Sequence, residues 1–360
     1  MALPCLPFTI LNFMRNLALF IFFLFTSISI THAQVKPFHF RGEKLKPGSK
    51  HSFLLPVVTP QDSTVIPVTV FHGVKKGPVL GITAGVHGLE YAPIMAAQQL
   101  AKQLDPTQMS GTVILVHMAN VPSFLNRSLR VNPFDGKNLN RVFPGKKDGT
   151  STERIAWIIS NEIIARCDNF IDVHAGDANN DLRPYSGYYN YFNQPDVSEK
   201  ARQMAVALGF DFIVQFGNQP QLTEASIYCS REATKRNIPA VDIECGRMGI
   251  VEEKPVQQIV EALTSLMRHL NILEGQPNRD EKPVMVAQRT DVSSEQTGFF
   301  YSELTSGDYV KKGMKLGYTT DLFGKHLADV FCPVDGVILY KTFNPPVKKG
   351  DGLFNIGHIQ

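Results

Sequence analysis

The sequence predicts an α/β fold, in which helices flank a mixed, mostly parallel β-sheet, followed by a small all-β domain. Two observations lead to this prediction. From about residue 53, short apolar runs rich in β-branched residues alternate with longer stretches of helical periodicity. Beyond residue 282 glycine is frequent and no long helical pattern appears. Strands that alternate with helices are typical of parallel sheets, because a helix carries the chain back to the same edge of the sheet.

The elements of the first part follow from hydrophobic periodicity and turn residues. Strands are expected at Ile66–Phe71, Val79–Ala84, Thr112–His117, Asn169–Val173, Asp211–Gln215 and Ala240–Glu244. Helices are expected at Tyr91–Gln103, Glu153–Ala165, Val197–Leu208, Ser226–Arg236 and Lys254–Leu270. Active sites in such sheets lie at the carboxyl ends of the strands, so the residues that follow each strand are the candidates for chemistry.

The N-terminal segment has the pattern of a secretory signal peptide. Leu17–Ile30 is apolar and uncharged, Arg15 precedes it, and Ala33 ends a short stretch suited to cleavage. The apolar run is shorter than the roughly 20 residues that span a bilayer. We therefore expect residues 1–33 to be removed, and the protein to be periplasmic or secreted with no stable membrane span. A retained N-terminal anchor is the alternative.

A polar linker at residues 274–282 separates two compositions. We expect a catalytic domain at residues 34–273 and a C-terminal β domain at residues 283–360. Within the β domain, the run Val-Lys-Lys-Gly at 310–313 recurs at 347–350. An internal repeat in a short all-β segment indicates two similar halves in a small sandwich or barrel.

The C-terminal segment resembles the barrel-sandwich hybrid of biotinyl and lipoyl domains. Its hairpin at residues 321–325 lacks the adjacent Asp-Lys pair of a lipoylated hairpin. We therefore predict no carried cofactor, and expect the segment to shape the cleft or to mediate assembly.

Charge and cysteine content narrow the functional classes. The chain has 36 Lys and Arg against 33 Asp and Glu, and the predicted signal peptide removes one Arg and no acid. A nearly balanced charge predicts no nucleic-acid partner. The remaining cysteines have no CxxC spacing, so a disulfide and buried free thiols both stay open. They are Cys167, Cys229, Cys245 and Cys332.

Two predicted strands end at histidines. His87 and Glu90 follow the strand Val79–Ala84 at the start of a helix, three residues apart, so both can bind one ion. His174 directly follows the strand Asn169–Val173. Two imidazoles and one carboxylate with an open fourth position form a catalytic zinc set. Asp172 could orient an imidazole or accept from nearby backbone donors.

A carboxylate at a third strand end is the candidate base. Glu244 closes the strand Ala240–Glu244, and Gly246 leaves room beside it. A base in this position would take a proton from the attacking water and deliver it to the leaving amine. An ion pair between Glu244 and Arg247, or a capping role for Glu244, is the alternative.

A loop between the two histidines carries polar groups suited to a carboxylate. Residues 130–145 are dense in Pro, Gly and Asn and include Arg130, Asn140 and Arg141. Guanidinium groups bind carboxylates through two parallel hydrogen bonds and can stabilise a developing oxyanion.

Four motifs together resemble the succinylglutamate desuccinylase and aspartoacylase family of the zinc carboxypeptidase superfamily. They are GVHGLE at 85–90, RVNPFDGKNLNRVFPG at 130–145, IDVHAG at 171–176 and DIECG at 242–246. They occur in the order that the family requires and span roughly residues 65–260. The C-terminal β segment is also similar to the family's C-terminal part, so the resemblance implies a carboxypeptidase-like fold.

The resemblance also implies roles for single residues. One zinc ion would be bound by His87, Glu90 and His174. Arg130 would polarise the scissile carbonyl, Asn140 and Arg141 would hold the substrate carboxylate, and Glu244 would be the general base. The resemblance assigns no residue to the family's further arginines or to a substrate-binding tyrosine. The candidates without a role are Arg183, Arg231, Arg247 and Tyr185.

The predicted function is an exported zinc-dependent hydrolase that cleaves an amide bond in a carboxylate-bearing substrate, either an N-acyl amino acid or a short peptide. The alternative is a non-catalytic protein of the same fold that binds a metal or a carboxylate ligand. The acyl group and the oligomeric state stay open.

Overall fold

The computed structural model describes Met1 and residues 35–217, 226–278 and 282–359, so the predicted signal peptide at residues 1–33 lies almost wholly outside the described residues. The described residues from Pro37 onward form one compact unit. Among the described residues, no helix is long and apolar enough to cross a membrane.

A nine-stranded sheet forms the centre of the fold, in the order β12-β10-β9-β11-β7-β5-β6-β4-β3. Five of its neighbouring pairs are parallel and three are antiparallel, which confirms the expected mixed, mostly parallel sheet. The strands are β3 (Ser49–Val58), β4 (Ser63–His72), β5 (Lys75–Ala84), β6 (Ser110–Val116), β7 (Asn169–His174), β9 (Tyr185–Tyr189), β10 (Phe212–Phe216), β11 (Ala240–Glu244) and β12 (Val284–Val286).

Every strand expected from the sequence lies in this sheet, and β3, β9 and β12 are additional. β3 carries Pro56 and has mostly exposed or half-buried side chains. Proline cannot donate to a neighbouring strand, so it is tolerated here because β3 is the edge strand. β9 contains Gly187 and runs antiparallel to β11.

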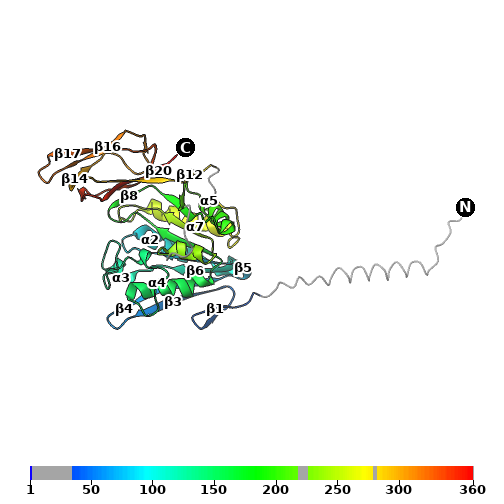
Figure 1. Cartoon of the computed structure of the whole chain (residues 1–360). Coiled ribbons are helices and arrows are strands. Elements are labelled where there is room, and N and C mark those ends of the chain that lie inside the picture. Colours follow the sequence, from blue (N-terminus) through cyan, green and yellow to red (C-terminus); the bar gives the residue numbers. More distant parts are fainter. Residues whose placement is uncertain (2–34, 218–225, 279–281, 360) are drawn as a thin grey trace. The chain divides into compact units, whose positions relative to one another are not determined.

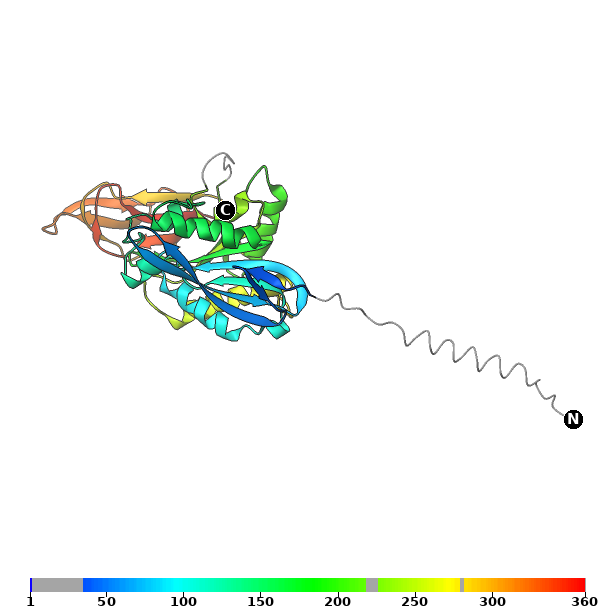
Figure 2. The same cartoon turned by 90° about the horizontal axis from the view of Figure 1, so that it is seen from below.

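Helices cover both faces of the sheet (Figures 1 and 2). One face packs on α2 (Tyr91–Gln103), α5 (Pro195–Ala207) and α7 (Glu253–His269). The other packs on α4 (Ser151–Ile158) and α6 (Cys229–Lys235). The predicted helix Glu153–Ala165 continues beyond α4 through a π-turn at Ile159–Ile163 and a 3₁₀ turn at Ile164–Arg166.

Local sequence explains where these helices begin. At α4, the side chain of Glu153 accepts from the backbone nitrogen of Thr150, which satisfies a donor that the helix itself cannot pair. α5 begins at Pro195, whose missing N–H costs nothing in the first turn. The shorter elements are β1 (Phe38–Phe40), β2 (Glu43–Leu45), α3 (Val121–Leu125), η1 (Pro106–Gln108) and η2 (Leu139–Arg141).

The C-terminal segment consists of antiparallel sheets around its own core, as expected. One sheet has the order β13-β20-β18-β15, with β8 (Asn180–Leu182) pairing to β18, and the other has the order β17-β16-β14-β19. The strands are β13 (Arg289–Ser293), β14 (Gly298–Tyr301), β15 (Tyr309–Val310), β16 (Lys315–Thr320), β17 (His326–Phe331), β18 (Gly336–Thr342), β19 (Pro346–Val347) and β20 (Gly352–His358).

The two copies of the Val-Lys-Lys-Gly repeat have equivalent structures. Each begins at the end of a short strand, β15 or β19, with a buried valine, and each ends at a glycine with positive φ, 83° at Gly313 and 92° at Gly350. A left-handed conformation of this kind favours glycine because it has no Cβ.

Strand pairing connects the C-terminal segment to the first part of the chain. β12 pairs with β10 in the large sheet, and β8 pairs with β18 in the C-terminal sheet. The domain limits at 34–273 and 283–360 stay predictions.

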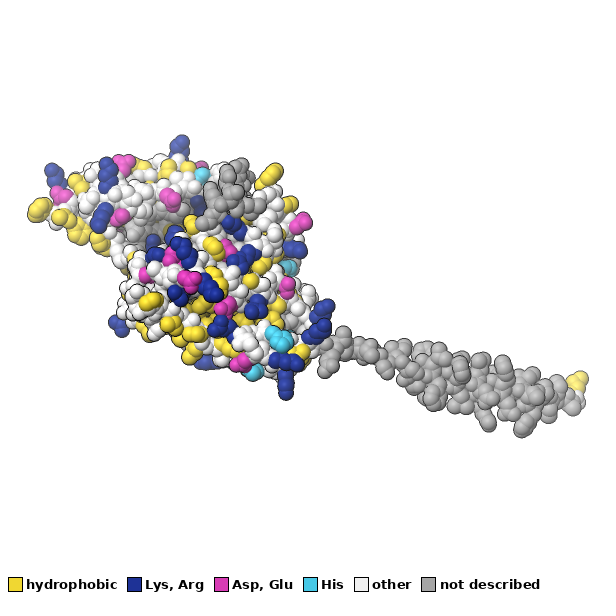
Figure 3. Space-filling view, turned by 60° about the horizontal axis from the view of Figure 1, so that its bottom comes forward, with side chains coloured by type: hydrophobic (Ala, Val, Ile, Leu, Met, Phe, Trp, Pro, Cys, Tyr) yellow, Lys and Arg dark blue, Asp and Glu magenta, His cyan; other side chains and the backbone are white. Residues whose placement is uncertain are grey.

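Figure 3 shows basic and acidic side chains interspersed over the face drawn, and hydrophobic side chains near the β16–β17 hairpin, where Leu322 and Phe323 are 76% and 97% exposed.

The four cysteines within the described chain are free and buried. Cys167 and Cys229 belong to the core on one face of the sheet and Cys245 to the core on the other. Of the two alternatives that the sequence left open, the structure shows buried thiols.

Candidate active site

A glycine-rich turn after β5 places His87 and Glu90. Gly85 has φ 68°, and a Cβ at Gly88 would lie 2.3 Å from the backbone of Ser123 in α3. Glycine at both positions therefore allows the chain to leave the strand sharply and pass close to α3. Glu90 then occupies the N-cap position of α2.

His174 reaches the same place from the neighbouring strand. It is the last residue of β7, which runs parallel to β5 with Ala84 opposite Val173. Parallel strands end at the same edge of a sheet, so the two histidines converge, with ring centroids 5.4 Å apart. The convergence expected from the sequence is therefore present.

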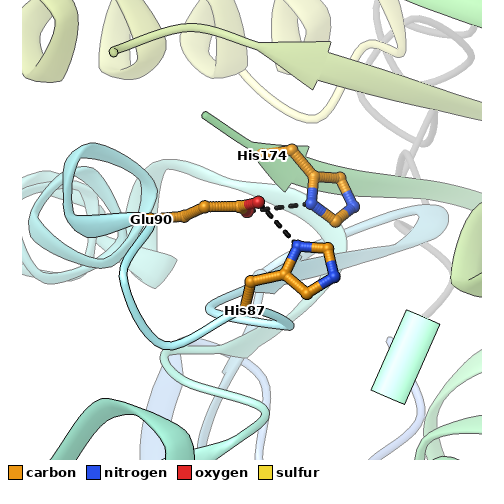
Figure 4. A group of neighbouring side chains, drawn as sticks. All are labelled: His87, Glu90 and His174. Carbon is orange, nitrogen blue, oxygen red and sulfur yellow. Dashed lines mark hydrogen bonds and ion pairs between the residues drawn. The ribbon is translucent and has the colours of Figure 1, made fainter. Parts of the chain in front are cut away.

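Both imidazoles face the carboxylate of Glu90 (Figure 4). Nδ1 of His87 lies 2.6 Å from Oε1, and Nδ1 of His174 lies 2.9 Å from Oε2. Glu90 and His174 are buried and His87 is half-buried. The ligand atoms of all three lie within 4.8 Å of one another, which suits a single shared ion.

The second nitrogen of each ring is held by an acceptor. Nε2 of His174 lies 2.8 Å from Oδ2 of Asp172, and Nε2 of His87 lies 3.1 Å from Oδ1 of Asn138. In neutral rings, these acceptors favour the proton on Nε2, so that the Nδ1 lone pairs would face Glu90. Acceptors that hold the far nitrogen of an imidazole in this way orient metal-binding histidines.

In neutral rings without a bound cation, the Nδ1 atoms of His87 and His174 would both face the carboxylate of Glu90 as acceptors. The pKa values of Glu90 and His174 are shifted accordingly. Burial opposes the ionisation of Glu90, but the two imidazoles lower its pKa to about 2. Burial likewise opposes charge on His174, yet Asp172 and Glu90 raise its pKa well above the usual value. The arrangement thus favours a positive charge between the three side chains, and its two nitrogens and one carboxylate fit a zinc ion.

Glu244 lies beside this group. It ends β11, and its Cα is paired with that of His174 across the parallel β11–β7 ladder. Burial raises the pKa of Glu244 to about 8, against the opposing charge of His174 and a hydrogen bond to Tyr340. Gly246, with φ 107°, would carry a Cβ 2.8 Å from that of Ala92, so only glycine leaves enough room at the following turn.

The loop at residues 130–145 brings its polar groups to the same site. Asn140 Nδ2 lies 3.5 Å from Nε2 of His174, and Asn140 Oδ1 accepts from the backbone nitrogen of Cys229 at 2.9 Å. Arg141 donates from Nη1 to the carbonyl of Asn140 at 2.6 Å, and its guanidinium lies 4.7 Å from the ring centroid of Tyr228. These contacts fix both side chains before any substrate binds.

Arg130 is held by an ion pair. Its Nε donates to Oδ2 of the buried Asp177 at 2.5 Å, while about half of the Arg130 side chain stays exposed. Because Asp177 occupies Nε, the terminal nitrogens remain for another acceptor.

One cleft of about 770 Å³ contains every residue to which the sequence assigned a role. They are His87, Glu90, Arg130, Asn140, Arg141, His174 and Glu244. Their individual roles stay predictions. Of the arginines and the tyrosine without a role, Arg231 and Tyr185 line the cleft, whereas Arg183 pairs with Asp211 and Arg247 pairs with Asp181 and Glu252.

The C-terminal segment forms part of the cleft wall, which sequence motifs did not reveal. Tyr340 comes from β18, and its hydroxyl lies 2.8 Å from that of Tyr185. The residues of this wall are Arg289, Asp291, Tyr340, Thr342, Gly352, Leu353, Phe354 and Asn355. No sequence motif predicts that these residues lie near Glu244 or His174. The sequence suggested only that the C-terminal segment as a whole could shape the cleft.

Sequence comparison identifies relatives over most of the chain. The model of the succinylglutamate desuccinylase/aspartoacylase catalytic domain matches residues 76–270. The N-alpha-acetyl-L-2,4-diaminobutyric acid deacetylase of Halomonas elongata is 28% identical over 324 residues, which cover 87% of this chain and 92% of that protein.

Solved structures share the fold. A succinylglutamate desuccinylase/aspartoacylase from Rhodobacter sphaeroides has a TM-score of 0.77 at 23% identity, covering 86% of this chain and 96% of the other. The product-bound ectoine utilization protein EutE (DoeB) from Ruegeria pomeroyi also has a TM-score of 0.77, at 25% identity, covering 86% and 95%. The fold similarity therefore includes the C-terminal segment as well as the large sheet.

Proposed function

Since the chain belongs to the succinylglutamate desuccinylase/aspartoacylase family, we propose that it is a zinc-dependent hydrolase of the amide bond in an N-acyl amino acid or a short peptide with a free carboxylate. The deacetylase from Halomonas elongata, whose name specifies an N-acetylated amino acid, supports hydrolysis of a carbon–nitrogen bond. The observation that carries the proposal is the convergence of His87, Glu90 and His174 beside Glu244.

The metal site is the first part of the proposal. A zinc ion bound by His87, Glu90 and His174 would supply Lewis-acid catalysis to the scissile carbonyl and to water. Asp172 and Asn138 would hold the two imidazoles in the tautomer that points Nδ1 at the ion.

Glu244 acts as the general base in this proposal. It accepts a proton from the attacking water and then delivers it to the nitrogen of the leaving amine. A pKa raised by burial suits a base that works near neutral pH. The opposite charge of a neighbouring cation would lower this pKa and keep Glu244 ionised at the start of the reaction.

Two parts of the substrate are bound by polar side chains in this proposal. Arg130 binds the scissile carbonyl oxygen, and the Asn140–Arg141 pair binds the carboxylate. The terminal nitrogens of Arg130, held by Asp177, stabilise the oxygen that becomes negative when water adds to the carbonyl. Arg141, fixed against Tyr228, binds the substrate carboxylate together with the amide of Asn140. The two arginines have different tasks in this proposal, and they differ in their contacts: Arg130 pairs with Asp177, whereas Arg141 contacts the ring of Tyr228.

The test combines metal analysis with a release assay on purified protein. The panel contains N-acyl amino acids and peptides with a free C-terminus, each assayed with and without a chelator. One zinc per chain and chelator-sensitive amine release would support the proposal. Glu244→Gln serves as the matched control, since it keeps the side-chain volume and removes the base; an equally active Glu244→Gln protein would contradict the assigned role.

We also propose that the protein is exported, on the basis of residues 1–33 alone. The test is N-terminal sequencing of the protein purified from its native source. A mature N-terminus at Gln34 would support export with cleavage, and a chain that still begins at Met1 in the cytoplasmic fraction would contradict it.

A further inference from the structure

A second pair of charged side chains lies in the cleft, on strand β13 of the C-terminal segment. Arg289 and Asp291 line both the cleft and a polar recess of about 430 Å³. Gly217 and Asn355 also belong to both linings, so the recess is continuous with the cleft. The reaction proposed above uses neither charge.

Arg289 is exposed and contacts an aromatic ring, and it forms no ion pair with a carboxylate of the described residues. Its guanidinium lies 5.1 Å from the ring centroid of Phe216, and the β13–β20 ladder places its backbone opposite Gly357. Within the part of the chain that the structure describes, no carboxylate forms an ion pair with it. An arginine that is held by an aromatic ring and lacks an acid partner is suited to binding a carboxylate.

Asp291 supplies the opposite charge two residues along the same strand. Its Oδ1 accepts from Nδ2 of Asn355 at 2.6 Å, and it has no cationic partner among the described side chains. Residues i and i+2 of a strand point to one face, and the rise per residue sets their Cβ atoms roughly 7 Å apart. This spacing accommodates a group that carries both a carboxylate and an ammonium, each one hydrogen bond from its partner.

A row of aromatic rings runs through the cleft to this pair. Phe216 packs on Tyr189 with centroids 5.3 Å apart, and Tyr189 packs on Tyr191 at 5.8 Å. Arg231 donates to the hydroxyl of Tyr191 at 3.0 Å, and all of these side chains line the cleft. A volume of about 770 Å³ lies within the range that holds drug-sized ligands, so the cleft has room for more than an acetylated amino acid.

We propose that Arg289 and Asp291 select the acyl group of the substrate by binding an amino-acid head group at its distal end, with the carboxylate on Arg289 and the ammonium on Asp291. The inference rests on the proposed function, in which Asn140 and Arg141 hold the carboxylate on the amine side of the scissile bond. The proposal places the acyl side along the row of aromatic rings, so that its distal end reaches Arg289 and Asp291 on β13. The substrate class is an amide whose acyl chain ends in an α-amino acid group, as in a γ-glutamyl amide.

The test is a series of four amides of one amino acid with matched acyl chains. γ-Glutamyl carries both distal charges, glutaryl only the carboxylate, 4-aminopentanoyl only the ammonium, and pentanoyl neither. We expect kcat/KM to be highest for γ-glutamyl. Arg289→Gln should lower the glutaryl-to-pentanoyl ratio of kcat/KM, and Asp291→Asn the 4-aminopentanoyl-to-pentanoyl ratio, each by about tenfold or more, as expected for a lost charge-assisted hydrogen bond.

Arg183→Gln is the matched control for Arg289→Gln. Arg183 also lies over an aromatic ring, 5.0 Å from the centroid of Phe212, but it is not among the described residues that line the cleft. Its replacement should leave all ratios as in the parent protein. Equal kcat/KM for γ-glutamyl and pentanoyl amides in the parent, or an equal loss on all four substrates in Arg289→Gln, would overturn the inference while the hydrolase remains.

A binding measurement separates this inference from the proposed function. Calorimetric titration of Glu244→Gln with the γ-glutamyl and pentanoyl amides does not require turnover. Binding of the γ-glutamyl amide at least about tenfold tighter supports the distal site even if no amide of the series is cleaved. Equal binding of the two overturns it. If the zinc-loaded parent protein cleaves none of the amides, the result counts against the proposed function and not against the distal site.

Discussion

The contact between Asp172 and His174 should control metal affinity. Asp172→Asn preserves the shape of the side chain and an acceptor oxygen, but removes the negative charge 2.8 Å from Nε2 of His174. Asp172 is 1% exposed, so water cannot replace the lost interaction. A hydrogen bond to a charged group contributes about 1.5–3 kcal/mol, which corresponds to roughly 10–100-fold in an equilibrium constant. Losses of this size are typical when the acceptors that hold metal-binding histidines are removed.

The assay is competition for zinc between the protein and a chromophoric chelator, with the dissociation constant measured for each variant. We expect Asp172→Asn to bind zinc about 10–100-fold more weakly than the parent protein. Asn138→Ala should lose less zinc affinity than Asp172→Asn. It removes a neutral acceptor 3.1 Å from Nε2 of His87, and neutral hydrogen bonds contribute about 0.5–1.5 kcal/mol. Asp168→Asn is the control: Asp168 precedes the other end of β7 and accepts from Val79. Parent-like affinity in Asp172→Asn, or an equal loss in Asp168→Asn, would refute the reasoning.

Three further predictions follow from the same geometry. Glu244→Gln should retain zinc and lose about 10²–10⁴-fold in kcat, measured by amine release together with metal analysis; loss of the metal would indicate a structural role instead. The kcat/KM of the zinc protein should rise with pH as Glu244 loses its proton. The midpoint should lie below about 8, the pKa of Glu244 without a cation, because a neighbouring cation lowers the pKa of a carboxyl group. A midpoint above 8 would contradict this prediction. The metal-free protein should melt at lower temperature as pH falls from 4.5 toward 2, because Glu90 has a depressed pKa and its stabilising contribution is present above 4.5 and lost toward 2. Calorimetry should show a smaller change in the melting temperature of the metal-free Glu90→Gln protein over the same pH interval.

The candidate ligand set could be predicted from the sequence because its residues follow the ends of two recognisable strands. His87 and Glu90 lie three residues apart where an apolar strand becomes a helix, and His174 ends a strand that is buried on both faces. Buried parallel strands are recognisable from continuous apolar residues, and their carboxyl ends meet at one edge of the sheet. For the same reason Glu244 could be predicted at the carboxyl end of a strand, and the β11–β7 register then pairs it with His174.

Strands with weak local patterns were not predicted. β3 contains Pro56 and is exposed along most of its length, and β12 is only three residues long. β9 contains Gly187 and runs antiparallel to β11, although parallel pairs predominate in the sheet. Such strands exist because their neighbours supply hydrogen-bond partners, and those partners lie far away in the sequence.

The sequence by itself determined the fold class and predicted a metal site with a candidate base beside it, because these inferences depend on residue type and local spacing. Only the tertiary structure decided which side chains form the opposite wall of the cleft. Tyr340, Arg289 and Asp291 reach it through the pairing of β13, β18 and β20 and the attachment of β18 to β8. No periodicity encodes these contacts, since each results from packing between strands that are distant in the chain and stabilised by burial of their shared core.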